Sequence, residues 1–326
     1  MQKNWQTLLK EAITDPAELL DQLALNPNLL PAAQRIATLF PLRVPKNFVA
    51  RMQKGNLADP LLQQVFPLAA EAITMPGFSR DPLQEQAVNP LPGLLHKYQG
   101  RVLISMTGAC AVNCRYCFRR HFPYADNRAG GRAWQKIVTY IAADTSIREV
   151  IFSGGDPLLA QDHYLEQCAK DLANIAQVKI LRIHSRLPIV LPERITAEFS
   201  HWFSSTRLQA ILVTHSNHAN ELGDSVRCAI DRLRQQKVTV LNQTVLLKGI
   251  NDNLEALMNL SQRLFECGIL PYYLHLLDKV QGAAHFAVSR TKAKQLIAAL
   301  SERLPGYLVP KCVYEQAGAK SKLPVI

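Results

Sequence analysis

Three cysteines in one short stretch form the feature of the sequence with the clearest chemistry. Cys110, Cys114 and Cys117 are spaced C-x3-C-x2-C and directly follow an apolar run at residues 101–106. Iron–sulfur clusters are held by Cys thiolates, and a loop with three thiolates supplies one ligand too few for a four-iron cluster. The spacing therefore predicts an iron–sulfur loop in which one iron is open to bind another molecule.

Other uses of these thiols fit the spacing less well. Structural zinc takes four ligands, usually from two C-x2-C pairs or from one such pair with two histidines, and neither pattern is present. A c-type haem needs C-x2-C-H, whereas Phe118 follows Cys117. The remaining cysteines stand singly in apolar segments, as in a reduced cytosolic protein that uses them in its core. They are Cys168, Cys228, Cys267 and Cys312.

The composition is typical of a globular enzyme. The chain has 326 residues, of which 48% are hydrophobic and 19% charged. No apolar run approaches the roughly 18 residues that span a bilayer, and the first residues lack the apolar block of a secretory signal. The formal net charge is +11, but Lys and Arg are spread along the chain without a basic tail. We therefore expect a cytoplasmic protein with neither a membrane nor a nucleic acid as partner.

Strand-like and helix-like segments alternate from about residue 100, which predicts repeated β/α units around a parallel sheet. The predicted strands are Val102–Met106, Glu149–Phe152, Lys179–His184, Leu208–Thr214, Thr239–Thr244 and Tyr272–Leu277. The predicted crossover helices are Arg132–Ala143, Asp162–Ile175, Pro192–Trp202, Asn220–Gln236 and Asn253–Cys267. In such folds ligands bind beyond the carboxyl ends of the strands, where the cysteine loop would also lie.

Polar segments end the other predicted strands as well. Each one alone could be a turn or a satisfied hydrogen bond near the surface, and the glycine pair in the first suits a plain turn. Their succession predicts a shared pocket at the carboxyl ends of the strands. The segments are Ser153-Gly-Gly-Asp-Pro157, His184-Ser-Arg186, His215-Ser-Asn217, Asn242-Gln-Thr244 and Leu277-Asp278-Lys279.

The two ends of the chain differ from this core. Residues 1–95 contain helix-like segments interrupted by many prolines and carry no recognisable chemistry, so they either wrap the core or dock a partner. Residues 306–315 predict a final strand, and Lys322 follows on a loop of small residues. A lysine beside a pocket can form a Schiff base with an aldehyde cofactor, although a lysine near a chain end is more commonly a solvated charge.

Taken together, these motifs resemble the lysine 2,3-aminomutase family of radical S-adenosylmethionine (SAM) enzymes over residues 95–324. The resemblance implies an α/β fold, a partial (β/α)6 radical SAM barrel with a mainly helical N-terminal extension. The implied parts are the extension at 1–95, the core at 96–305, and a C-terminal strand with a segment that binds pyridoxal phosphate (PLP) at 306–326. The motifs are the cysteine loop with Phe118-Arg-Arg120, the Ser153–Pro157 turn, His215-Ser-Asn-His218, Asn242–Asn251, the strand that ends at Asp278, and Ser321-Lys-Leu-Pro324.

The family resemblance also implies site residues. Lys322 is the implied catalytic residue that carries PLP; Lys320 precedes it by two positions, but the Leu-Pro after Lys322 matches the family pattern. Arg119 is the implied contact of the substrate carboxylate, which a planar guanidinium suits. The other implied contacts are Cys110, Cys114 and Cys117 with a 4Fe–4S cluster; Ser153, Gly154, Gly155, Asp156, His215 and Gln243 with SAM; Lys97 and Arg101 with the PLP phosphate; and Asp278 and Glu315 with the substrate's side-chain ammonium.

The implied activity is that of an isomerase that converts free L-lysine to β-lysine by moving the amino group from Cα to Cβ. The sequence is most similar to the bacterial branch whose product modifies elongation factor P, which implies a functional link to a lysyl ligase for that factor. An external electron donor is also implied, and a homo-oligomer is left open.

Two rival functions use only part of these features. A radical SAM enzyme without PLP, such as a methyltransferase or a glycyl-radical activase, would need the cysteine loop but not Lys322. A non-catalytic iron–sulfur or zinc protein that binds RNA or a translation factor would use the positive charge and show salt-sensitive affinity.

Overall fold

A single curved sheet organises the molecule. The structure, a computed structural model, describes residues 4–127 and 129–325. Within them the nine strands of the sheet follow one another in chain order; β2 to β8 are parallel, and β1 and β9 pair antiparallel at the two edges. The strands are β1 Leu94–Tyr98, β2 Arg101–Thr107, β3 Glu149–Gly154, β4 Ile180–Ser185, β5 Gln209–His215, β6 Thr239–Leu246, β7 Leu270–Leu276, β8 Lys311–Tyr314 and β9 Leu323–Pro324.

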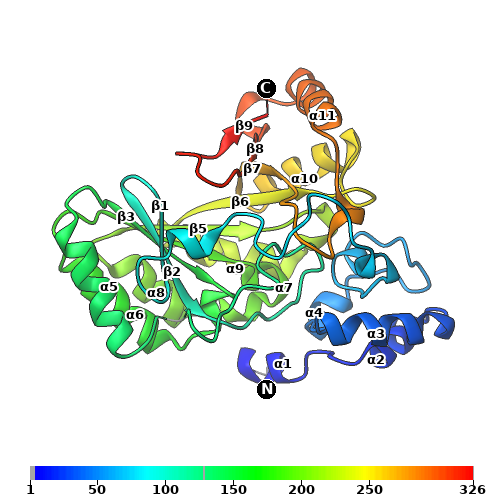
Figure 1. Ribbon diagram of the computed structural model, residues 1–326, viewed down its shortest axis with the longest axis horizontal. Helices are drawn as coiled ribbons and strands as arrows, with labels where there is room; N and C mark the ends of the chain where they lie inside the picture. The colour runs from blue at the N-terminus through cyan, green and yellow to red at the C-terminus, as the bar shows by residue number, and fades with distance from the viewer. Residues whose placement is uncertain (1–3, 128, 326) are drawn as a thin grey trace.

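Amphipathic helices connect the parallel strands and cover one side of the sheet, where α5, α6, α8 and α9 lie together (Figure 1). In α9, for example, Val226, Ala229, Ile230 and Leu233 are buried, the spacing of a single apolar helix face. The α-helices are α1 Trp5–Lys10, α2 Pro16–Gln22, α3 Leu30–Leu39, α4 Lys46–Val49, α5 Arg132–Ala143, α6 Asp162–Ala173, α7 Leu187–Val190, α8 Ala197–Ser205, α9 Asp224–Gln235, α10 Leu254–Glu266 and α11 Arg290–Arg303.

Short 3₁₀ turns complete the connections. They are η1 Pro27–Leu29, η2 Leu62–Gln64, η3 Ala69–Ala72, η4 Glu85–Val88, η5 Pro157–Leu159, η6 Pro192–Arg194, η7 Ala219–Glu221, η8 Ala284–Phe286 and η9 Gly306–Leu308.

The predicted α/β fold, a partial (β/α)6 barrel, is confirmed. All six predicted strands are present, and α5 has the predicted bounds. The single helix predicted at 192–202 is wrong, because Ile195 leaves helical geometry with φ −81° and ψ 78°. Thr196 then starts α8 as its N-cap, where its side chain accepts a hydrogen bond from the backbone N–H of Phe199.

The two ends of the sheet and one helix differ from the prediction. The strand expected over 306–315 is limited to β8, because a 3₁₀ turn occupies Gly306–Leu308. Strand β1 begins at Leu94, so the division expected between residues 95 and 96 falls inside a strand. Its hairpin with β2 turns at Gly100, whose φ of 78° favours glycine. Helix α11 was missed as well.

The helical N-terminal segment, residues 4–93, packs along one side of the barrel and away from α5 and α6 (Figure 1). Asp15 caps the start of helix α2 by accepting a hydrogen bond from the backbone N–H of Ala17 at 2.9 Å. Arg51 ties the segment to the barrel loops by donating to the carbonyl oxygens of Glu221 and Ile189. The segment is therefore part of the packed structure around the strand ends.

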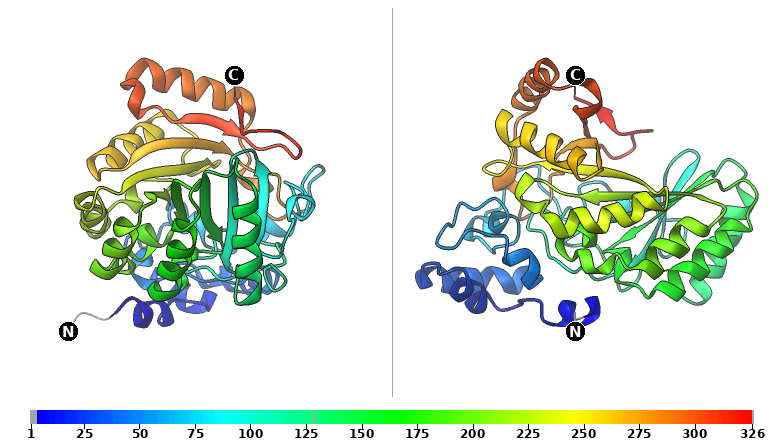
Figure 2. Two further views of the ribbon diagram at one scale, coloured as in Figure 1. Left: turned by 90° about the vertical axis from the view of Figure 1, so that its left-hand side faces the viewer. Right: turned by 180° about the vertical axis from the view of Figure 1, so that it is seen from behind.

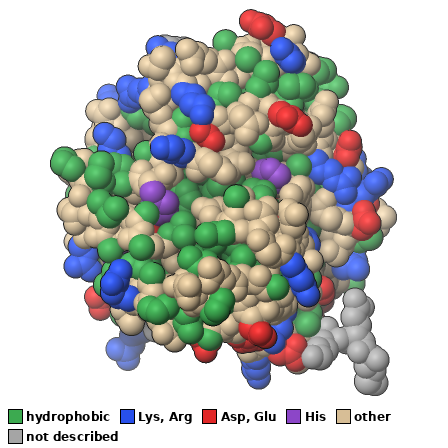
Figure 3. Space-filling view, turned by 90° about the vertical axis from the view of Figure 1, so that its right-hand side faces the viewer, with side chains coloured by type: hydrophobic (Ala, Val, Ile, Leu, Met, Phe, Trp, Pro, Cys, Tyr) green, Lys and Arg blue, Asp and Glu red, His purple; other side chains and the backbone are tan. Residues whose placement is uncertain are grey.

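None of the helices within residues 4–127 and 129–325 is long and apolar enough to cross a membrane. On the face shown in Figure 3, Lys and Arg side chains are interspersed with acidic and apolar ones.

A buried ion cluster fastens the N-terminal segment to the cysteine loop. Glu71 accepts two hydrogen bonds from Arg115, at 2.8 and 2.7 Å, and one from Arg120 at 2.9 Å. These side chains are at most 3% exposed. Such a cluster is held in place because removing one partner leaves uncompensated charge in the interior.

We expect Glu71→Ala to lower the free energy of unfolding by about 3–5 kcal/mol, because it leaves two buried guanidinium groups without their carboxylate. Urea unfolding followed by circular dichroism measures the change. The control is Glu166→Ala, which removes the exposed pair between Glu166 and Lys170 and should cost about 0.5 kcal/mol or less. Equal effects of the two substitutions would contradict the interpretation.

Candidate active site

The candidate site lies at the carboxyl ends of the parallel strands. The cysteine loop follows β2, and the Ser153–Pro157 turn follows β3. Strand β4 ends at Ser185 and β5 at His215. The polar strand ends therefore meet at the carboxyl-terminal end of the parallel sheet, as their succession predicts.

Backbone contacts with the N-terminal segment hold the cysteine loop. The N–H of Asn113 donates to the carbonyl of Arg43, and the N–H of Arg115 donates to the carbonyl of Gln64, both at 2.9 Å. Within the loop, the N–H of Cys117 donates to the carbonyl of Cys114 at 3.0 Å. The loop conformation thus depends on residues far away in the sequence.

The three thiols of the loop suit a cluster better than a single ion. All three are free and half-buried. Burial, followed by the charge of Cys114, raises the pKa of Cys117 to about 11, and burial also raises the pKa of Cys110. Cationic metal would compensate for this cost, because a coordinating thiol is deprotonated. No three ligating side chains in residues 4–127 and 129–325 converge on one ion site, whereas cluster thiolates bind separate irons.

The glycine pair after β3 has a packing reason that the sequence did not reveal. A Cβ on Gly154 would lie 2.5 Å from Ser105 Oγ, and one on Gly155 would lie 2.2 Å from the carbonyl oxygen of Ala109. Gly154 also has a φ of 108°. Neither position admits a side chain, because the backbone leading to the cysteine loop passes directly against this turn.

Asp156 connects the ends of β3 and β4 through hydrogen bonds. Its carboxylate accepts hydrogen bonds from Ser185 Oγ at 2.7 Å and from the backbone N–H groups of Arg186 and Leu187 at 2.8 and 3.0 Å. Burial raises the pKa of Asp156, and these donors oppose the rise. The contacts assign Asp156 a structural role, and its contact with SAM stays a prediction, as does that of Ser153.

Unpartnered nitrogen atoms line the interior. Among the described residues, the Nε2 atoms of His184, His215, Gln243 and His275 are buried without a hydrogen-bond partner. Burial lowers the pKa of all three histidines, that of His215 to about 4, so the rings are neutral at pH 7. Buried polar atoms without partners indicate a place for a ligand. The residues come from the neighbouring strands β4, β5, β6 and β7.

Glu315 links edge strand β1 to the C-terminal segment that carries Lys322. Its carboxylate pairs with the ammonium of Lys322, with Lys97 Nζ at 2.8 Å and with the Tyr98 hydroxyl at 3.3 Å. Lys97 and Tyr98 belong to β1, which lies near the C-terminal segment in the left-hand view of Figure 2. Burial alone would raise the pKa of Glu315, but the two lysines hold it well below its usual range.

Asp278 completes this acidic cluster. Burial and the nearby charge of Glu315 raise its pKa to about 7, although Lys322 opposes the rise. Lys322 lies 5.5 Å from the centre of the Tyr273 ring, and Arg101 lies 4.8 Å from that of Tyr98. The structure thus brings Lys322, Asp278 and Glu315 together, while Lys97 donates to Glu315 and its contact with the PLP phosphate stays a prediction.

Arg119 forms a bidentate pair with Glu85, a residue that the sequence reasoning missed. Its Nε and Nη2 atoms donate to the two carboxylate oxygens at 2.7 and 2.8 Å. Burial would lower the pKa of Arg119, but Glu85 reverses the effect and raises it. Both side chains line a cavity of about 270 Å³ beside Phe118 and His121. Arg119 therefore already holds a carboxylate in the geometry expected for a substrate.

His275 was missed as well. It carried a usable signal, since it is a polar residue on an apolar strand, whereas Glu85 sits in a segment without a pattern. His184 was predicted to lie at the shared pocket but was given no role. Only the packing of η4 against the loop after Cys117 brings Glu85 to Arg119.

Comparison with known proteins finds relatives over nearly the whole chain. A family model described as a 4Fe-4S single cluster domain matches residues 99–183, which include the cysteine loop. The chain is 52% identical to the L-lysine 2,3-aminomutase of Escherichia coli K12, over 99% of this chain and 94% of the relative. It is 50% identical to that of Haemophilus influenzae, over 98% and 95%. The chain belongs to the L-lysine 2,3-aminomutase family. The predicted membership is confirmed.

More distant members of the family are similar too. The L-lysine 2,3-aminomutase of Clostridium subterminale is 32% identical over 99% of this chain and 78% of the relative. A crystal structure of a radical SAM methyltransferase from Sphaerobacter thermophilus aligns with a TM-score of 0.49 at 14% identity, covering 72% of this chain and 73% of that one.

The raised pKa of Asp278 makes stability depend on pH. Between about pH 4 and 7 the folded protein keeps a proton on Asp278 that the unfolded chain has lost, so the free energy of unfolding falls as pH rises through this window. Asp278→Asn lacks this proton. We expect the free energy of unfolding of the variant, relative to that of the wild type, to rise by about 2 kcal/mol from pH 5 to pH 8. Urea unfolding at each pH measures this difference. A stability difference that is flat with pH would show that Asp278 titrates normally.

Proposed function

We propose that the protein converts free L-lysine to β-lysine, using a 4Fe–4S cluster, SAM and PLP. The observation that carries the proposal is the cluster of Lys322, Asp278 and Glu315 at the same strand ends as the cysteine loop. A cluster loop alone serves many reactions, but a half-buried lysine beside two acids suits an aldehyde cofactor and a diamino substrate. The relatives are named L-lysine 2,3-aminomutase, which supports the same substrate.

The cofactors have candidate residues in the site. Cys110, Cys114 and Cys117 would hold the cluster, and Lys322 would hold PLP, with Arg101 and Lys97 near its phosphate. The Ser153–Asp156 turn, His215 and Gln243 would contact SAM. The unpartnered Nε2 atoms of His215 and Gln243 fit a bound ligand. When bound, these groups supply a hydrogen-abstracting radical and an aldehyde carrier for the migrating amino group.

Lys322 must lose a proton before it can attack an aldehyde, and Glu315 is placed to orient it. The carboxylate of Glu315 contacts the Lys322 ammonium directly and also holds Lys97. It can therefore orient Lys322, but the two lysines hold its pKa well below its usual range, so Glu315 stays ionised and is a poor acceptor for the proton. The nearby histidines are neutral, so they offer hydrogen bonds without adding positive charge to the interior.

The substrate's charges match the charged side chains of the site. Arg119 can bind the carboxylate of lysine bidentately, and Asp278 with Glu315 can receive its terminal ammonium. In the structure Glu85 fills the carboxylate position on Arg119. We infer that lysine displaces Glu85 from the Nε and Nη2 atoms, the edge of the guanidinium that already binds a carboxylate bidentately.

We further infer that the β-lysine formed supplies modification of elongation factor P through a lysyl ligase. The supporting observation is that the chain covers 94% and 95% of the E. coli and H. influenzae relatives but 78% of the clostridial one. It is thus most similar to the shorter members of the family.

Lys322→Ala tests the proposed function directly. Protein reconstituted without oxygen with iron, sulfide, PLP, SAM and reductant should form β-lysine from L-lysine, and the variant should be at least about a hundredfold slower. Chromatography measures the product. Lys320→Ala is the matched control, because Lys320 is exposed, lies two residues away and should keep activity.

Borohydride trapping should attach PLP to Lys322 and not to Lys320, as peptide masses would show. SAM cleavage without β-lysine, unchanged in Lys322→Ala, would instead indicate a radical SAM enzyme without PLP. Metal binding without SAM cleavage, together with salt-sensitive binding of RNA, would indicate the non-catalytic alternative.

Glu85→Gln tests the exchange at Arg119. The neutral amide should bind Arg119 more weakly than the carboxylate, so we expect the KM for lysine to fall by up to about tenfold with a smaller change in kcat. Arg119→Lys should raise the KM for the substrate, because the ammonium group of the substituted side chain cannot bind a carboxylate bidentately as a guanidinium does. A higher KM in Glu85→Gln would mean that Glu85 supports the bound substrate and does not compete with it.

A further inference from the structure

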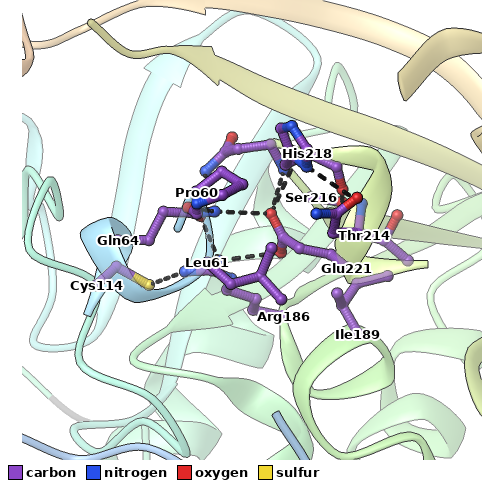
Figure 4. A network of polar contacts seen from close by, with 12 residues as sticks. Pro60, Leu61, Gln64, Cys114, Arg186, Ile189, Thr214, Ser216, His218 and Glu221 are labelled. Carbon is purple, nitrogen blue, oxygen red and sulfur yellow. Dashed lines mark hydrogen bonds and ion pairs between the residues drawn. The ribbon is translucent and has the colours of Figure 1, made fainter. Parts of the chain in front are cut away.

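A buried arginine contacts one thiol of the cysteine loop. Arg186 follows β4, and its Nη1 atom donates to Cys114 Sγ at 2.7 Å (Figure 4). Its side chain is 6% exposed. The family resemblance gave Arg186 no role, and the sequence shows only that it stands at a polar strand end.

The rest of the guanidinium group is fixed by the N-terminal segment and by the loop after β5. Its Nη2 atom donates to Gln64 Oε1 at 2.6 Å and to Glu221 Oε2 at 3.0 Å. Glu221 is held in turn, because its Oε1 accepts from Gln64 Nε2 and from the backbone N–H groups of Asn217 and His218. Figure 4 shows these contacts forming one continuous network. Arg186 therefore points at Cys114 in a defined orientation.

We propose that Arg186 is a positioning residue that raises the reduction potential of the cluster by donating an N–H to the Cys114 thiolate. The inference rests on the proposed cluster at this loop, but not on lysine as substrate. An external one-electron donor reduces the cluster, which then carries one more negative charge. A hydrogen bond and a positive charge at a ligand sulfur stabilise that reduced state, so the potential rises.

Glu221 sets how much of this charge the cluster experiences. Its carboxylate offsets the guanidinium from the side opposite Cys114, and Gln64 contacts both groups without adding charge. Removal of Arg186 should therefore lower the potential, whereas removal of the Glu221 charge should raise it. Opposite shifts from two residues of one buried pair are not expected from a loss of packing, which would move both variants alike.

The test is a redox titration of the reconstituted cluster, followed by electron paramagnetic resonance, in the wild type and in Arg186→Gln and Glu221→Gln. We expect Arg186→Gln to lower the ratio of reduced to oxidised cluster at a fixed applied potential by about tenfold. For a one-electron couple this corresponds to a shift of about 59 mV to more negative values. Glu221→Gln should shift the midpoint to more positive values, because it removes the negative charge that offsets Arg186. The amide oxygen of the glutamine can still accept from the backbone N–H groups, so the loop should keep its conformation.

Arg194→Gln is the matched control. Arg194 is also fully buried and paired with a carboxylate, that of Asp162 at 2.8 Å, but its hydrogen bonds go to Asp162, Leu158 and Ala160 and not to the loop. It should leave the midpoint unchanged. If Arg186→Gln fails to fold, Arg186→Lys and Glu221→Gln still carry the test.

Two results would overturn the inference. One is a midpoint that does not change in either variant, with or without weaker SAM binding, since Arg186 would then act on something other than the cluster. The other is a shift of both variants in the same direction. Failure of the proposed lysine reaction is distinguishable, because the titration needs only the bound cluster and contains neither lysine nor PLP.

Discussion

Three buried arginines around the cysteine loop are each paired with a carboxylate, and this constraint explains how the site is built. Arg115, Arg119 and Arg186 all lie near the cysteine loop in surroundings that exclude most water. An isolated guanidinium there would cost several kcal/mol, so each is held against a carboxylate. The positions of these carboxylates consequently determine how the loop and the strand ends are arranged.

The N-terminal segment supplies partners for all three arginines. Glu71 pairs with Arg115, Glu85 pairs with Arg119, and Gln64 accepts a hydrogen bond from Arg186. The segment has no strand and no catalytic motif within the described residues, yet its side chains reach the cysteine loop from three separate turns, η2, η3 and η4. It therefore acts as a structural support for the metal loop and for the substrate side of the site, in addition to covering the barrel.

The inside and the rim of the barrel have different electrostatics. Inside, the histidines on β4, β5 and β7 are neutral because burial lowers their pKa values. Near the sheet edges, Glu315 between two lysines is held ionised while Asp278 has a pKa near neutrality. This division suits a reaction in which a neutral interior leaves a reactive radical intact while charged groups select a substrate with three charges.

The sequence by itself determined the chemistry and the order of the elements, and the tertiary structure decided the partners. The C-x3-C-x2-C spacing, the six apolar strands and the polar residues that end them are local patterns, so they predicted the parallel barrel and placed Cys110 and Asp156 at its strand ends. Lys322 was singled out only by the family resemblance. The pairing of Arg119 with Glu85 and the contact of Arg186 with Cys114 join residues 34 and 72 positions apart. Such contacts are set by how distant segments pack, and no periodicity in the chain encodes them.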